Sequence, residues 1–182
     1  MKEKNLNLPN ILASFRIALA PLMLWFMIDQ QNSIFQGWHS SWFDYFAGLI
    51  FVLASVTDFF DGYIARSWNQ MTVLGSILDP LADKMLMLAG FIGLIVLNRA
   101  SAFAVFLILT REFFITGIRV VAVQQGKSVA STMSGKIKTV LQMIAIGFLI
   151  MNWPYGTELL WLATFLTLYS GYEYIRDYLK QI

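Results

Sequence analysis

Six long apolar runs, separated by short polar links, constrain the fold of this chain more than any other feature. They cover about residues 11–28, 43–66, 76–97, 102–123, 137–151 and 158–178. Most approach the roughly 20 residues that an α-helix needs to cross a bilayer. Charged residues make up only 13% of the chain, against about 25% in soluble domains. The sequence therefore predicts an all-α integral membrane protein with six transmembrane helices. One membrane domain is expected over residues 1–182, with a short interfacial segment at residues 1–10 before the first helix.

The lysines and arginines fall mainly on one side of the predicted topology. That side collects Lys2, Lys4, Arg16, Arg66, Lys127, Lys136, Lys138, Arg176 and Lys180. The opposite side collects essentially Arg99. Because Lys-rich and Arg-rich loops remain in the cytoplasm, both termini and the link around residues 58–83 are expected on the cytoplasmic side of the membrane. An even number of spans agrees with this orientation.

Composition also excludes several kinds of chemistry. The chain has no cysteine, so disulfides and thiolate catalysis are excluded. Its net charge of +2 is too small to indicate nucleic-acid binding. His39 lies in a polar link and is interpreted as a solvated loop residue, because no partner for histidine chemistry is evident nearby.

Four aspartates stand at the facing ends of the second and third apolar runs. An aspartate at membrane depth costs about 2.5–3.5 kcal/mol on insertion scales and usually has a function. Asp58 and Asp61 are three residues apart, and Asp79 and Asp83 are four apart, so each pair shares one face of a helix. Two such faces could bind divalent cations, which prefer oxygen ligands.

Three interpretations of these carboxylates compete. Neutralisation by basic neighbours is disfavoured, since only Arg66 and Lys84 lie close in sequence. A transporter's ion or proton pathway is the second interpretation, because such pathways also use intramembrane carboxylates. The third is a two-metal site for phosphoryl transfer. The small residues Gly62, Ala65 and Gly75 favour it by leaving room for a head group, and Arg66 can donate two hydrogen bonds to a phosphate.

The complete acidic motif resembles the signature of a known family. The pattern is Asp58-x-x-Asp61-Gly62-x-x-Ala65-Arg66, then eight residues, then Gly75-x-x-x-Asp79-x-x-x-Asp83. It is similar to the signature of the CDP-alcohol phosphotransferases, integral membrane enzymes of phospholipid synthesis. Further stretches resemble the bacterial branch whose product is phosphatidylglycerophosphate. They are PNILASFR at residues 9–16, TREFFITGIR at 110–119 and GKIKT at 135–139, with Gln142.

This resemblance implies a reaction and a setting. An alcohol hydroxyl attacks the lipid-side phosphorus of CDP-diacylglycerol, and CMP leaves. In the branch named above, the alcohol is sn-glycerol 3-phosphate. The resemblance also implies a homodimer in the bacterial inner membrane, with the active site on the cytoplasmic side.

The resemblance further implies a role for each acidic residue. Asp58, Asp61 and Asp79 would be the main ligands of two divalent ions, Mg²⁺ or Mn²⁺. Asp83 would be the general base and could also contact the second ion. Residues expected to bind CDP-diacylglycerol are Gly62, Ala65, Arg66 and Gly75, with Asn10 and Arg16 closing the nucleotide side.

The acceptor carries its own phosphate, which requires cations. Arg111, Arg119, Lys136 and Lys138 are the candidates, because they lie towards the predicted cytoplasmic side. Arg111 and Arg119 are eight residues apart, close to one helix face. Simpler alternatives remain. The two lysines could be a flank that contacts anionic lipid, and Arg111 could pair with Glu112.

Other functions stay open beside glycerophosphate transfer. A member of the same family could use another acceptor, as synthases of the cardiolipin, phosphatidylserine or inositol-phosphate type do. Membrane prenyltransferases also bind diphosphates through aspartates and Mg²⁺, but usually through two separated acidic motifs. An ion-coupled transporter would move its substrate without releasing CMP.

Overall fold

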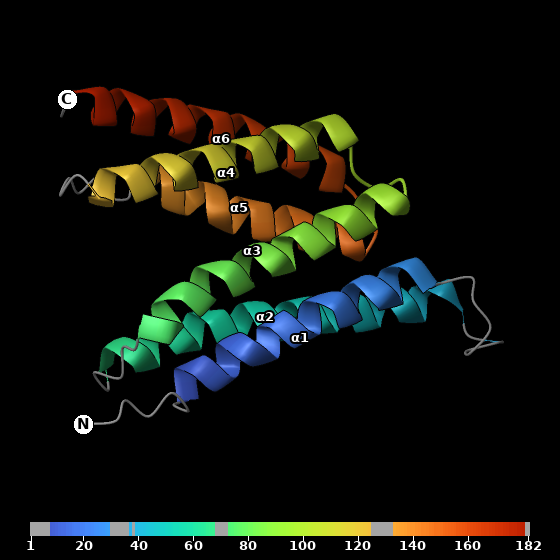
Figure 1. Cartoon of the computed structure of the whole chain (residues 1–182). Coiled ribbons are helices and arrows are strands. Elements are labelled where there is room, and N and C mark those ends of the chain that lie inside the picture. The colour runs from blue at the N-terminus through green and yellow to red at the C-terminus, as the bar shows by residue number, and fades with distance from the viewer. Residues whose placement is uncertain (1–7, 30–36, 38, 68–72, 125–132, 181–182) are drawn as a thin grey trace. The chain divides into compact units, whose positions relative to one another are not determined.

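Among the residues that the computed structural model of the chain describes, there are six helices (Figure 1). The structure describes residues 8–29, 37, 39–67, 73–124 and 133–180, and it leaves out the side chains of residues 8–10, 58–67, 73–80, 83 and 123. The helices are α1 (Leu8–Ile28), α2 (Ser40–Ser67), α3 (Val73–Val96), α4 (Ala102–Gln124), α5 (Met133–Ile150) and α6 (Gly156–Leu179). No strand occurs among these residues. The predicted all-α class is therefore confirmed.

Each helix corresponds to one predicted apolar run. The largest difference lies at the start of α5, which begins at Met133 rather than at about residue 137. Helix α1 begins at Leu8, so residues 8–10 are helical, and their place at the membrane interface remains a prediction. Residues 1–7 of the predicted interfacial segment lie outside the described residues. Helices extend past their apolar runs because backbone hydrogen bonding continues into polar residues at either end.

Three of the described helices contain stretches long and apolar enough to cross a membrane. These stretches are Ile11–Ile28, Ser40–Thr57 and Met133–Ile150. In α3 the apolar stretch found among the described side chains is Lys84–Val96. The chain is thus an all-α membrane protein, whereas membrane crossing by α3, α4 and α6 remains a prediction.

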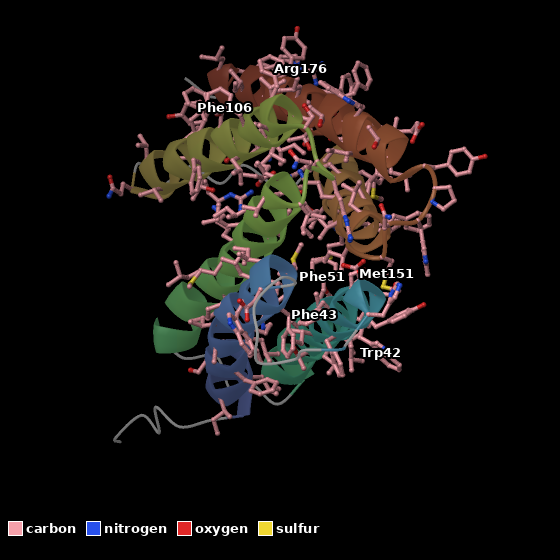
Figure 2. The ribbon with its side chains drawn as sticks, turned by 90° about the vertical axis from the view of Figure 1, so that its right-hand side faces the viewer. Trp42, Phe43, Phe51, Phe106, Met151 and Arg176 are labelled. Carbon is pink, nitrogen blue, oxygen red and sulfur yellow. The ribbon has the colours of Figure 1, made fainter. Side chains whose placement is uncertain are left out.

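The helices group into two compact units, residues 1–97 and residues 98–182. In the first unit α1 packs against both α2 and α3. Small and flexible buried side chains on α1, among them Ala13, Ala20 and Met27, allow this close packing. On α2, Phe43 and Phe51 are buried, whereas Trp42 is exposed (Figure 2).

In the second unit α6 packs against both α4 and α5. The buried residues of α6 are mostly small or carry hydroxyl groups, and they recur at helical spacing. They are Gly156, Leu160, Ala163, Thr164, Thr167, Ser170, Gly171 and Tyr174. Thr167 Oγ1 accepts a hydrogen bond of 2.7 Å from Gln142 Nε2 of α5. This row of α6 residues therefore offers polar partners in the interior of the second unit.

Candidate functional site

The acidic motif lies on two helices of the first unit. Asp58 and Asp61 belong to the C-terminal part of α2, and Asp79 and Asp83 belong to the N-terminal half of α3. Because both segments are helical, residues three or four apart share one helix face, as predicted for each pair of aspartates. Both pairs belong to helices that contact each other.

The ends of α2 and α3 are joined by a short link, and the two helices contact each other. Residues 68–72 connect Ser67 to Val73, and a chain of this length spans at most about 20 Å. Four carboxylates are thus carried by neighbouring helix ends, and their oxygens suit Mg²⁺ or Mn²⁺. The donor chemistry and the helical spacing fit a divalent-metal site.

The side chains of this motif lie outside the described residues, so their roles remain predictions. These residues are Asp58, Asp61, Gly62, Ala65, Arg66, Gly75, Asp79 and Asp83, together with Asn10 in α1. Among the side chains that are described, no group of three or more His, Cys, Asp or Glu residues could hold a metal ion. Arg16 is described and is fully buried in α1, with 0% of its surface exposed.

The second unit brings two of the four predicted phosphate-binding residues to one carboxylate. Arg111 Nη1 donates a hydrogen bond of 3.3 Å to Glu112 Oε1. Lys138 Nζ, from α5, donates to the same oxygen. The Arg111–Glu112 contact considered from the sequence therefore exists, but Lys138 shares it. A guanidinium and an ammonium group from two helices meet at a single oxygen atom.

Helix α6 holds Arg111 from the other side. Arg111 Nη2 donates a hydrogen bond of 3.0 Å to Ser170 Oγ. Its aliphatic stem lies against Gly171, where an added Cβ would be 3.0 Å from Arg111 Cγ and 3.1 Å from Nε. The absence of a side chain at Gly171 thus allows the arginine stem to lie close to α6. The sequence analysis missed both α6 residues, although the spacing of small and hydroxyl-bearing residues along this apolar helix would have indicated them.

The other two predicted phosphate-binding residues have different surroundings. The guanidinium of Arg119 stands 5.9 Å from the ring centre of Tyr174, a cation–π contact. Lys136 is exposed, whereas Lys138 is buried. Residues two apart on a helix differ by about 200° in direction, so these two lysines occupy opposite sides of α5.

Comparison with known proteins gives the family of the chain. The family model for CDP-alcohol phosphatidyltransferase matches residues 6–169. Members of this family generally depend on divalent metal ions.

Relatives with the same name occur in several bacteria. A CDP-diacylglycerol–glycerol-3-phosphate 3-phosphatidyltransferase of Bacillus subtilis (strain 168) is 40% identical, covering 92% of this chain and 93% of its own. The protein of that name from Rickettsia bellii is 39% identical, covering 93% and 94%. That from Shigella flexneri serotype 5b is 35% identical, covering 93% of both chains. With an acidic motif carried by adjoining helices and a family match over most of its length, this chain belongs to the CDP-alcohol phosphatidyltransferase family.

Proposed function

We propose that this protein transfers the phosphatidyl group of CDP-diacylglycerol to sn-glycerol 3-phosphate, forming phosphatidylglycerophosphate and CMP. The observation that carries the proposal is the similarity to relatives that are named for this activity. They are 35–40% identical to this chain over more than nine-tenths of each chain. The complete acidic motif of residues 58–83 supports the same reaction.

We infer that the acidic motif holds two divalent ions, Mg²⁺ or Mn²⁺. Asp58, Asp61 and Asp79 are the proposed main ligands, and Asp83 can contact the second ion. This assignment is supported by the helical spacing within each pair and by the oxygen chemistry of the ligands. Such ions, when bound, neutralise the charge of the diphosphate and make the acceptor hydroxyl easier to deprotonate.

Asp83 is the proposed general base. Its carboxylate takes the proton of the acceptor hydroxyl as that oxygen forms a bond to the lipid-side phosphorus. The bond between this phosphorus and the bridging oxygen breaks, and CMP leaves with the electron pair. A carboxylate next to bound cations stays ionised at neutral pH, as this role requires.

The nucleotide and diphosphate of the donor are assigned to residues around the aspartates. Arg66 suits a phosphate group, because its guanidinium can donate two parallel hydrogen bonds. The small residues leave room for the substrate beside the backbone. The proposed donor-binding residues are Gly62, Ala65, Arg66, Gly75 and Asn10.

The phosphate of glycerol 3-phosphate is assigned to Arg111, Arg119, Lys136 and Lys138. The convergence of Arg111 and Lys138 on Glu112 supports this assignment, because a phosphate needs more than one donor. The alternative in which Lys136 contacts anionic lipid is compatible with its exposure.

The location is proposed from charge and resemblance. We infer a multi-pass protein of the bacterial inner membrane, with both termini and the active site on the cytoplasmic side. The excess of lysine and arginine on one side of the predicted topology supports this orientation. The homodimer rests on the resemblance to the family alone.

The proposed reaction predicts a specific product balance. Purified protein with CDP-diacylglycerol, Mg²⁺ and labelled glycerol 3-phosphate is expected to release one CMP for each phosphatidylglycerophosphate formed. Turnover with serine, inositol phosphate or phosphatidylglycerol, but not with glycerol 3-phosphate, would reject the acceptor and keep the family chemistry. Substrate flux into proteoliposomes without any CMP release would favour a transporter instead. Turnover of a prenyl diphosphate would favour a prenyltransferase.

Gly171→Ala is expected to weaken acceptor binding without removing any charge. The new methyl group would lie 3.0 Å from Arg111 Cγ, so the arginine stem must move by a few tenths of an ångström. We expect the KM for glycerol 3-phosphate to rise about threefold, since small displacements of substrate-binding groups are costly. The KM for CDP-diacylglycerol should stay unchanged in the same assay.

Gly147→Ala is the matched control, because an added Cβ at this α5 position meets nothing within 4 Å. Both substitutions replace a helical glycine and raise helix propensity similarly, by roughly 1 kcal/mol. An equal change of KM in the two variants would contradict the role of Gly171.

A further inference from the structure

We propose that Glu112 is a positioning residue of the acceptor site, whose carboxylate holds Arg111 and Lys138 together so that both bind the acceptor phosphate. The inference rests on the proposed function. It adds an anionic residue that positions the proposed phosphate-binding cations. Glu112 acts through its two partners and does not itself contact the substrate.

One carboxylate oxygen of Glu112 lies between two cationic side chains and accepts a hydrogen bond from each. Glu112 Oε1 accepts a hydrogen bond from Arg111 Nη1, at 3.3 Å, and another from Lys138 Nζ. Arg111 and Glu112 belong to α4, whereas Lys138 belongs to α5. The carboxylate thus links the two helices that carry the proposed phosphate-binding cations.

A third helix fixes the arrangement. Arg111 Nη2 donates to Ser170 Oγ of α6 at 3.0 Å, and the arginine stem lies against Gly171. Arg111 is therefore held at both terminal nitrogens, one by Glu112 and one by Ser170. Lys138 Nζ donates to the same Glu112 oxygen as Arg111 Nη1, so this carboxylate links the lysine to an arginine that α6 already holds.

Burial makes the positioning necessary. The side chains of Lys138 and Arg111 are only 6% and 11% exposed, and that of Glu112 is 21% exposed. Repulsion between like charges grows as solvent is excluded. Two buried cations therefore remain close only where an anion lies between them. Before the acceptor phosphate arrives, Glu112 supplies that anion.

Glu112→Gln tests this role, because glutamine keeps the size and one carbonyl oxygen but removes the negative charge. We expect the KM for glycerol 3-phosphate to rise about tenfold, as for the loss of a charge-assisted hydrogen bond. The KM for CDP-diacylglycerol should remain within about twofold of the wild-type value. An unchanged or lowered KM for glycerol 3-phosphate would overturn the proposal. A lowered value would mean that Glu112 competes with the phosphate.

A double-mutant cycle with Lys138 separates positioning from general stabilisation. If Glu112 acts in part through Lys138, then Glu112→Gln should raise the KM for glycerol 3-phosphate less in the Lys138→Gln background than in the wild type. Full additivity of the two substitutions would overturn the proposal. Thermal unfolding of each variant records any loss of stability separately.

The conservative variant Glu112→Asp supplies the second test. It keeps the charge and shortens the side chain by one methylene, and the flexible lysine can partly follow. Its KM for glycerol 3-phosphate should therefore fall between those of the wild type and Glu112→Gln. If Glu112→Gln does not fold, the proposal is supported when Glu112→Asp raises the KM for glycerol 3-phosphate but not the KM for CDP-diacylglycerol. An equal rise in both substrates' KM values overturns it.

Glu158→Gln is the control, since Glu158 is exposed in the first turn of α6. It should leave both KM values unchanged. The wild-type assay distinguishes failure of the proposed function from failure of the role of Glu112. Wild-type protein that releases CMP only with another alcohol rejects the proposed acceptor and this inference together. Normal wild-type turnover with an unaffected Glu112→Gln variant rejects only the role of Glu112.

Discussion

Asp83→Asn is expected to lower kcat by about 10²- to 10⁴-fold, the usual contribution of a general base. Asparagine has nearly the same shape as aspartate, but it cannot accept the proton of the acceptor hydroxyl. Asp58, Asp61 and Asp79 remain in this variant, so binding of CDP-diacylglycerol and of divalent ions should persist. The measurements are single-turnover CMP release, and the binding of Mn²⁺ and of the donor to the purified variant.

Asp177→Asn is a suitable control for the loss of one carboxylate. Asp177 forms an exposed pair with Arg176 on α6, and pairs of this kind contribute little to stability. Its turnover should equal that of the wild type. Normal turnover of Asp83→Asn would reject the general base. Loss of Mn²⁺ binding together with turnover would instead make Asp83 chiefly a metal ligand.

Removal of divalent metal is expected to have an effect of similar size. Chelation with EDTA should lower turnover by about a thousandfold, because bound ions stabilise developing charge by several kcal/mol. Addition of Mg²⁺ or Mn²⁺ should restore turnover. Ca²⁺ should restore less, since it binds oxygen at longer distances and with looser geometry than Mg²⁺.

The number of ions can be measured without turnover. Titration with Mn²⁺, followed by electron paramagnetic resonance, should give two bound ions per chain. In Asp61→Asn at least one of these ions should be lost, because the variant removes a proposed ligand. Full activity after exhaustive chelation would contradict the metal site. A single bound ion in the active wild-type protein would contradict the two-metal assignment.

Prediction of the helices succeeded because their formation depends on local properties of the chain. Apolar runs and polar links mark the elements directly, and backbone hydrogen bonding within each helix needs no distant partner. The differences occur at helix ends. Helix α5 begins at Met133 because the polar residues before its apolar run continue the helix.

The acidic half of the candidate site could be proposed from the sequence for a similar reason, and it remains a prediction. Its residues lie close together in sequence, so the spacings of three and four residues already define helix faces. The basic half was predictable only as a set of residue types. Lys136 and Lys138 received the same assignment from the sequence, yet one is exposed and the other is buried.

The sequence by itself determined the six helices, the family and the residues of the acidic motif. Only the tertiary structure decided that Glu112 serves both Arg111 and Lys138, and that Ser170 and Gly171 hold Arg111 from α6. Lys138 follows Glu112 by 26 residues, and Ser170 follows Arg111 by 59. Contacts over such separations depend on how the helices pack and on their register, which the periodicity of a single helix does not specify.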